Sequence, residues 1–311
     1  MDLSGQVVGQ SRVGVRLTAL VAYLRQTMRL PLRALQQLLE TLHQVRVSIG
    51  ERSDLLRRTA IQGQAQMQQM LGQMRASPVV HADETGWREN GRNGSAWEVA
   101  TPDGLRYFPY ERSRAGAVIH RLLGDEFRGV LVTDCSAGDN DTPGGRHQRC
   151  WVHLLRDLPA LTEAHPMHIE VCAWAEAVKA LYERGMALPH DLPASMRPPV
   201  AMALQQEMRD LAATFVADKL HPTHALCQRL LRHEGELFRF VVDPTVPAHN
   251  NLAERGIRPL VIARTISGGC RSAQGSQTRM VLASLTQTWL AQGLNPFPQF
   301  LALLQSPLPQ L

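Results

Sequence analysis

Two aspartates stand at the ends of predicted strands, where they could serve as metal ligands. Asp83 ends the apolar run 78–83, and Asp134 ends a second run, 129–134. Aspartate is disfavoured within strands, so these positions call for a reason. At the carboxyl edge of an open α/β sheet, two neighbouring carboxylates would repel each other unless a cation or a proton lay between them. The alternative is that each aspartate caps the turn after its strand.

Glu254 is a third candidate, because it is the only acidic residue from position 246 to the end of the sequence. Asn250 precedes it by four residues and Arg258 follows it by four, so all three share one face of a predicted helix. Glu254 is therefore either a member of an ordinary helical ion pair or a ligand for a hard cation. The residue pattern alone leaves both readings open.

Together the three carboxylates have a chemical logic that none has alone. Two Mg²⁺ or Mn²⁺ ions held about 3.5 to 4 Å apart by carboxylates can activate a water or a 3′-hydroxyl for attack on a phosphodiester. The same ions stabilise the leaving oxygen, and oxygen ligands suit such hard cations. Asp83, Asp134 and Glu254 are therefore predicted to be both the catalytic residues and the ligands of two metal ions.

Five motifs resemble those of the insertion sequence 66 family of bacterial transposases, and they occur in the family's order. They are HADETGWR at 81–88, GVLVTD at 129–134, HQRCWVHLLRDL at 147–158, NNLAER at 250–255 and ISGGCRS at 266–272. The resemblance extends from about Val13 to Leu304. It implies a ribonuclease H-like catalytic domain in which Asp83, Asp134 and Glu254 take the places of an Asp-Asp-Glu triad.

The predicted fold is α/β, a ribonuclease H-like mixed sheet with a large helical insertion and a helical amino-terminal region. Apolar runs and turn signals predict antiparallel strands near 78–83, 96–101 and 105–110, a helix over 113–123 and a buried strand over 129–134. Fifty residues separate the two aspartates and 119 separate Asp134 from Glu254, which leaves room for a helical insertion at about 155–245. Residues 78–311 are thus predicted to form the catalytic domain.

Residues 1–77 are predicted to be helical, with a possible use in binding DNA. Apolar residues recur at helical spacing before and after Pro31, and Ser48 with Glu51 predicts a capping box that opens a long helix over 49–75. Arginines near this third helix would suit a helix-turn-helix contact with DNA. A small helical bundle with solvated arginines explains the same pattern equally well.

Both ends of the chain are basic, which favours a polyanion as partner. Residues 1–80 carry a net charge of +6 and residues 246–311 a net charge of +4, and only Lys179 and Lys219 among the 33 basic residues are lysines. Guanidinium groups suit bidentate phosphate contacts, although a GC-rich genome alone would also favour arginine codons. The residues predicted to lie near the DNA backbone are Arg255, Arg258, Arg264 and Arg271.

Cys150 and His153 form a C-x₂-H pair, with His147 three residues earlier on what is predicted to be the same helix face. No second ligand pair lies nearby, so packing or hydrogen bonding is favoured over a zinc site. Motifs for binding ATP or NAD are missing from the sequence. The five cysteines are an odd number and do not suggest a disulfide framework.

The main prediction is a DNA transposase that cuts and joins strands at the ends of an insertion element. Its expected partners are DNA at the element ends and the target, other copies of itself on DNA, and accessory proteins from the same element. With no apolar run long enough to span a bilayer and no secretion signal, the sequence predicts a cytoplasmic protein.

Two features favour an alternative, a truncated and catalytically decayed transposase that binds DNA without cutting it. Cys135, Ser136 and Asp139 follow Asp134 where relatives usually carry aromatic residues. The chain is also expected to lack the amino-terminal extension of full-length members. A third alternative is a structure-selective nuclease on the same fold.

Overall fold

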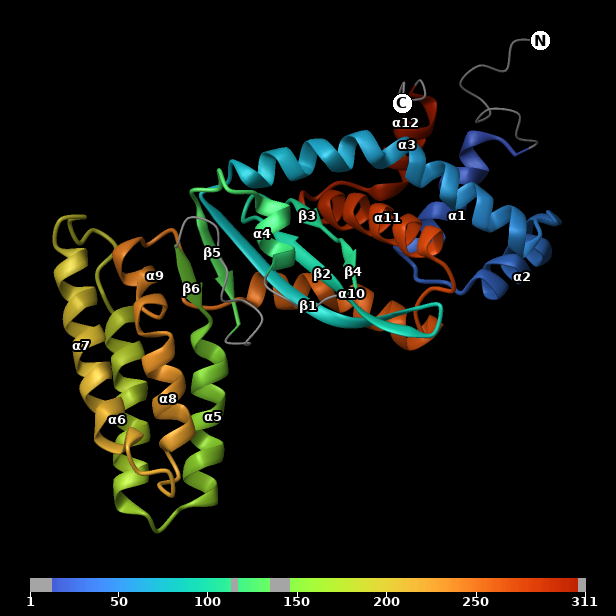
Figure 1. Ribbon diagram of the computed structural model, residues 1–311. Helices are drawn as coiled ribbons and strands as arrows, with labels where there is room; N and C mark the ends of the chain where they lie inside the picture. The colour runs from blue at the N-terminus through green and yellow to red at the C-terminus, as the bar shows by residue number, and fades with distance from the viewer. Residues whose placement is uncertain (1–12, 113–116, 135–145, 307–311) are drawn as a thin grey trace. The chain divides into compact units, whose positions relative to one another are not determined.

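The computed structural model describes residues 13–112, 117–134 and 146–306. The chain divides into two compact units. Unit 1 comprises residues 1–77, 82–124 and 252–311, and unit 2 comprises residues 78–81 and 125–251. The positions of the two units relative to one another are not determined (Figure 1). One boundary between the units falls within a long strand, between His81 and Ala82, and another falls between Asn251 and Leu252.

Three helices open the described part of unit 1, as the sequence predicted. They are α1 (Val15–Gln26), α2 (Leu32–His43) and α3 (Ile49–Arg75). The Ser48 hydroxyl accepts a hydrogen bond from the Glu51 amide at 3.1 Å, which confirms the predicted start of α3. α1 and α3 pack against α11 (Ala273–Ala291) and α12 (Pro296–Gln305), and Figure 1 shows α3 running beside α11.

A hairpin of β1 (Val79–Glu89) and β2 (Arg92–Ala100) forms the centre of the sheet. Its two-residue loop is Asn90-Gly91, and both residues have positive φ, 49° and 74°, as a primed turn requires. The predicted strands near 78–83 and 96–101 were therefore too short. The extra residues are mostly polar, and so gave no apolar run to recognise.

Two short strands, β3 (Arg106–Tyr107) and β4 (Tyr110–Glu111), pair antiparallel with β2, where one strand over 105–110 was predicted. The interruption has a clear cause. The Phe108 amide donates to the Ser284 hydroxyl of α11 at 2.9 Å instead of joining the ladder, and residue 109 is a proline.

One face of the hairpin packs against α10 (Asn251–Ser267). Trp87, Ala96 and Leu260 belong to one buried cluster together with Met280 of α11. Figure 1 shows α10 running alongside β1. After α10 the chain continues through a glycine-containing segment into α11 and α12. The predicted helix over 113–123 is confirmed in its described part as α4 (Ala117–Leu123).

In unit 2 the first residues of β1 pair in parallel with β5 (Val130–Thr133), and β5 pairs in parallel with β6 (His147–Arg149). The sheet is thus mixed, with the order β3-β2-β1-β5-β6 and β4 also paired to β2. β5 confirms the predicted strand over 129–134. The prediction of a helix from about His147 was wrong, because the polar residues of β6 carry no apolar signal.

A helical bundle with its own core follows β6, over most of the range 155–245 where a helical insertion was predicted. Its helices are α5 (Trp151–Ala164), α6 (Ile169–Met186), α7 (Arg197–Val216), α8 (His224–Arg232) and α9 (Arg239–Val242), with a 3₁₀ turn at Glu234–Glu236. Trp151, Trp174 and Met208 are buried in one cluster at its centre. None of the described helices is both long and apolar enough to span a bilayer.

Candidate functional site

Asp83 lies in the middle of β1, not at its end as the sequence suggested. Its side chain is half-buried, and its Oδ1 accepts a hydrogen bond from the Glu84 amide at 2.8 Å. Side chains alternate along a strand, so Asp83 belongs to the same face of β1 as Val79 and His81. That face packs inward in unit 2, where Val79 is buried with Val246.

Asp134 follows the last residue of β5, as predicted. The register pairs His81 with Val132, so Asp83 and Asp134 each lie two residues beyond the last paired residues of their parallel strands. The carbonyl group of Asp134 is held by the Arg149 guanidinium at 3.0 Å and by the Thr133 hydroxyl at 3.0 Å. These bonds fix the backbone that carries the Asp134 carboxylate.

A buried network in unit 2 anchors the segment that leads into α10. The Asn250 amide donates to the Cys150 sulfur at 3.2 Å, and the Asn250 side-chain oxygen lies 3.0 Å from Nδ1 of His81. Because an amide oxygen can only accept, this contact assigns the proton to Nδ1 of His81. All three residues are buried. Glu254 lies one helical turn after Asn250, in the first turn of α10, and is half-buried.

The β1–β5 register thus gives the two aspartates matching strand positions, and the His81–Asn250 contact holds the approach to α10 against β1. Asp83 and Glu254 belong to unit 1 and Asp134 to unit 2. The meeting of all three carboxylates at one pair of ions stays a prediction.

Glu98 is a fourth acidic residue that sequence reasoning missed. It lies on β2 with no exposed surface, and counting from the Asn90-Gly91 loop places it opposite Asp83. Neither of its carboxylate oxygens has a hydrogen-bond partner among the residues that the structure describes. Its nearest cation is Arg106, whose Nε is 3.5 Å from Oε1. The Asn-Gly dipeptide was the signal that could have found this pairing.

The first turns of α10 make room for Glu98. A Cβ on Gly256 would lie 1.9 Å from Oε1 of Glu98, so only glycine fits at this position. Burial raises the pKa of Glu98 well above its ordinary value; the Arg106 charge opposes this shift, and the Asp83 charge adds to it. Unit 1 therefore places two carboxyl groups, Asp83 and Glu98, between β1, β2 and the start of α10, and burial favours the protonated form of Glu98.

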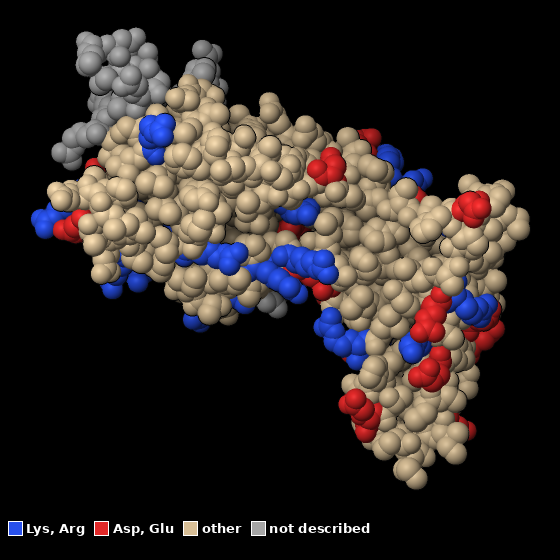
Figure 2. All heavy atoms as spheres, turned by 180° about the vertical axis from the view of Figure 1, so that it is seen from behind, with Lys and Arg blue, Asp and Glu red and all other residues tan. Residues whose placement is uncertain are grey.

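The four predicted DNA-contacting arginines have different surroundings in unit 1. Arg255, Arg258 and Arg271 are exposed, as a contact with a large ligand requires. Arg264 instead donates to the Thr85 hydroxyl at 2.8 Å and to the Gly86 carbonyl, and so ties α10 to β1. Figure 2 shows several basic side chains gathered along one edge of the visible face.

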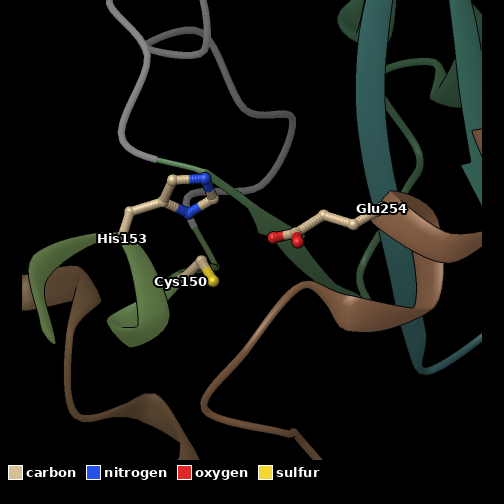
Figure 3. A group of neighbouring side chains, drawn as sticks. All are labelled: Cys150, His153 and Glu254. Atoms are coloured by element: carbon tan, nitrogen blue, oxygen red, sulfur yellow. The ribbon is translucent and has the colours of Figure 1, made fainter. Parts of the chain in front are cut away.

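Cys150 is the N-cap residue of α5 and His153 lies in its first turn; Figure 3 shows both side chains. The buried Cys150 sulfur accepts the Asn250 amide, which confirms hydrogen bonding for this cysteine. His147 does not share a helix face with them, because it lies on β6. Its Nε2 is 2.7 Å from the Thr133 hydroxyl. Cys135, Ser136 and Asp139, the departures from the family pattern, lie outside the described residues.

A group in the helical bundle could also hold a metal ion. His168, Glu170 and His221 each offer one ligand atom, and these atoms lie within 4.8 Å of one another. His221 also has structural contacts, because its ring stacks on Phe215 at 3.9 Å and its Nδ1 is 2.7 Å from the Thr223 hydroxyl. Packing of the bundle explains its position without an ion.

Comparison with known proteins agrees with the motifs. A protein of Sinorhizobium fredii (strain NBRC 101917 / NGR234), described as uncharacterized protein y4jO, is 31% identical over 176 residues. This stretch is 57% of the chain and 51% of the relative, so the chain spans about half the length of the curated relative it matches. The sequence model of the Transposase IS66 family matches residues 10–278. The chain therefore belongs to the IS66 family of transposases.

Proposed function

We propose that the chain is the catalytic part of a metal-dependent DNA transposase that cuts and joins phosphodiesters at the ends of an insertion element. Its central sheet would be that of a ribonuclease H-like domain, with the bundle α5–α9 as an insertion. Asp83, Asp134 and Glu254 would be its Asp-Asp-Glu triad. The partners would be DNA and further copies of the chain assembled on it, with accessory proteins from the same element.

The observation that carries the proposal is the register of β1 and β5. Because His81 pairs with Val132, both aspartates lie the same distance beyond the paired segment. The carboxyl ends of neighbouring parallel strands meet at one edge of a sheet, which is where ligands bind in such folds. The His81–Asn250 contact supports a place for the start of α10 on the same face.

The chemistry of the side chains fits Mg²⁺ or Mn²⁺. All three predicted ligands are carboxylates, and these ions prefer oxygen ligands. The buried carboxyl group of Glu98 lies opposite Asp83 without a hydrogen-bond partner among the described residues, and a metal ion bound beside it would favour its ionised form. Two such ions would supply an activated water or 3′-hydroxyl and stabilisation of the leaving oxygen.

The other residues of the site would position the carboxylates or contact the DNA. Arg149 and Thr133 hold the backbone at Asp134, so the direction of that carboxylate is set before any ion binds. Arg264 ties α10 to β1 and so limits movement of the helix that carries Glu254. The exposed Arg255 and Arg258 on α10 would contact the DNA backbone next to the site.

The test is cleavage and joining of DNA that carries the element ends, with purified protein and Mn²⁺. We expect Asp83→Asn, Asp134→Asn and Glu254→Gln each to lower the rate at least about 100-fold while the protein stays folded. Asp243→Asn is the matched control, since Asp243 caps a turn in unit 2 and should leave the rate unchanged.

Two outcomes would contradict the proposal. Equal cleavage by the triad variants and the unchanged protein would show that these carboxylates are not the metal ligands. DNA binding without cleavage in any divalent metal, with an affinity that falls steeply with salt, would instead establish the decayed transposase as the correct reading.

A further inference from the structure

Unit 1 contains a cavity of about 670 Å³ on which α1, α3 and the start of α11 border. The segment 266–272, which carries the last family motif, forms another part of its wall. Five arginines line it, and we call it the arginine cavity; they are Arg25, Arg33, Arg57, Arg271 and Arg279. Asp54 is its one acidic lining residue, and this carboxylate pairs with Arg57 at 3.0 Å. The other four arginines therefore leave the cavity strongly positive.

Arg279 is the most telling of these residues, because it is only 8% exposed. Within the described part of the chain it forms no ion pair, and no hydrogen bond of its guanidinium is found. Burial lowers the pKa of Arg279 to about 10, with a further decrease from the nearby charge of Arg25, so it remains a cation at neutral pH. A buried cation without a partner is costly, which points to an anion that binds here.

Arg25 adds a second charge beside Arg279 without compensating it. Its guanidinium donates to the Leu30 carbonyl at 2.9 Å, and burial lowers its pKa. The thiol of Cys270 is the nearest group that could become negative. Burial raises the pKa of that thiol, so it stays neutral at neutral pH. The two guanidinium groups thus repel each other, and a shared anion would remove that repulsion.

The start of α11 also favours the binding of an anion. Ser272 is its N-cap, and its hydroxyl accepts the Gly275 amide at 3.1 Å. The amides of Ala273 and Gln274 come earlier in the first turn and have no acceptor within the helix. Helix starts of this kind attract anions through free amides and the helix dipole. Ser272, Gln274 and Gly275 all line the arginine cavity.

We propose that the arginine cavity binds a phosphate group of a DNA strand. The guanidinium groups of Arg279 and Arg25 and the start of α11 would hold its oxygens, since planar guanidinium groups match phosphate geometry. A strand rather than a free ion is indicated because Arg33 and Arg271 are exposed while lining the same cavity, and so can contact neighbouring phosphates. The choice of DNA rests on the proposed function; the choice of phosphate does not.

The experiment uses the full chain and three single variants, Arg279→Met, Arg271→Ala and Arg16→Met. Arg16 is the matched control, because it is exposed on α1, the helix that carries Arg25, and does not line the cavity. Binding of a labelled single-stranded oligonucleotide is measured by fluorescence anisotropy, with inorganic phosphate as competitor. Melting temperatures are measured in phosphate and in chloride at equal ionic strength.

We expect phosphate to raise the melting temperature of the unchanged protein and to compete with the oligonucleotide. Arg279→Met should lower DNA affinity about tenfold or more, because bonds to charged groups are the strong ones. In chloride it should melt no lower than the unchanged protein, since a buried charge is gone. Arg271→Ala, an exposed position that does not endanger folding, should weaken DNA binding several-fold. Arg16→Met should change neither property.

Three results would overturn the proposal. Arg279→Met could melt lower in chloride and bind DNA normally, which would mean that Arg279 only supports the fold. Phosphate could stabilise Arg279→Met as much as the unchanged protein, which would place the anion elsewhere. Phosphate could bind without any effect of Arg279→Met or Arg271→Ala on DNA affinity, which would leave a free anion as the ligand.

Failure of this proposal and failure of the proposed function can be told apart. Asp83→Asn should lose cleavage but keep phosphate binding, because Asp83 does not line the arginine cavity. Phosphate binding at Arg279 without any DNA cleavage would leave the cavity standing and reject the catalytic role. DNA cleavage that Arg279→Met and Arg271→Ala leave unchanged would support the catalytic role and reject the arginine cavity as a DNA-binding site.

Discussion

Packing alone does not explain why Glu98 is buried. A carboxylate without exposed surface and without hydrogen bonds loses its hydration and gains little in return. Arg106 at 3.5 Å gives partial compensation, while Asp83 across the hairpin adds repulsion. A residue that costs stability in this way is often kept for a function, and here the nearest function is metal binding at Asp83.

Replacement of Glu98 by glutamine is therefore expected to increase stability and to weaken metal binding. Glu98→Gln should raise the melting temperature at neutral pH, because the folded protein then no longer buries a carboxyl group that must either stay charged or take up a proton. It should also weaken Mn²⁺ binding several-fold, measured by calorimetry, because glutamine cannot ionise beside Asp83 when the ion binds. Glu89→Gln is the control at the other end of β1, where Glu89 pairs with Arg112 at 3.8 Å. A lower melting temperature with unchanged Mn²⁺ affinity in Glu98→Gln would mean a purely structural ion pair.

For single residues, the sequence identified unusual acidic positions but could not predict which distant residues they contact. Asp83, Asp134 and Glu254 stood out because acidic residues are unusual where they occur. Glu98 did not, since a glutamate between Trp97 and Val99 looks like any outward-facing strand residue. Its burial depends on Gly256, which is 158 positions away in the chain, and no local pattern contains that contact.

At the scale of elements, the glycine-rich segment after α10 has a structural purpose. The Cys270 amide donates to the Arg88 carbonyl at 2.8 Å, so this segment joins the end of β1. Gly269 has a φ of 108°, and a Cβ there would lie 2.2 Å from the Arg88 oxygen. Gly268 has a φ of 69° but open space around it. The two neighbours thus need glycine for different reasons.

We expect Gly269→Ala to destabilise the protein by about 3 kcal/mol or more, since it combines an unfavourable φ with a clash against backbone. Gly268→Ala should cost only about 1 to 2 kcal/mol, the price of the left-handed conformation alone. Urea unfolding of both variants measures the difference. Equal losses would show that the backbone of 268–270 shifts freely, and that its contact with β1 is not rigid.

β6 illustrates an element that sequence patterns could not predict. His147, Gln148 and Arg149 are all buried, yet each is polar. Their partners come from distant segments, as when Gln148 accepts the Phe240 amide at 2.9 Å. The apolar strand β5 and the helices with clear periodicity were predicted, because their burial depends on local composition. β6 was missed, because its stability depends on contacts that form only in the folded chain.

The polar burial of β6 predicts a pH effect. Burial, with the Arg149 charge, lowers the pKa of His147 to about 3, although Glu236 opposes the shift. His147 therefore binds a proton near pH 6.5 in the unfolded chain but stays neutral in the folded chain. The free energy of unfolding thus falls as pH decreases from about 6.5 toward 3. The full slope is about 1.4 kcal/mol per pH unit.

Denaturant unfolding at several pH values tests this effect. His147→Gln should be less stable than the unchanged protein at pH 7.5 but should lose less stability between pH 6.5 and 4.5. Hydrogen bonds from His233 and Arg149 overcome the effect of burial and lower the pKa of Glu236 to about 2, so its contribution is lost only below about pH 4.5 and stays out of this window. The exposed His190, changed to Gln, is the control. Parallel pH profiles for all three proteins would contradict a neutral, buried His147.

At the scale of the whole molecule, each unit has a hydrophobic core of its own. Trp151 and Met208 belong to the core of the helical bundle in unit 2. Trp87 and Met280 belong to a cluster between the hairpin and the helices of unit 1. β1 is the strand that continues from one unit into the other. Because each unit has its own hydrophobic core, the two units are expected to unfold separately.

This expectation can be tested with one large-to-small substitution in each core. Met208→Ala in α7 and Leu285→Ala in α11 remove fully buried side chains, and each should cost about 2 to 5 kcal/mol. In urea, tryptophan fluorescence and circular dichroism should show two transitions, with each variant shifting only one of them. The bundle could then lose its structure while the arginine cavity in unit 1 still binds phosphate. A single transition that both variants shift equally would mean that the units fold as one, and that damage to the bundle also disables the site.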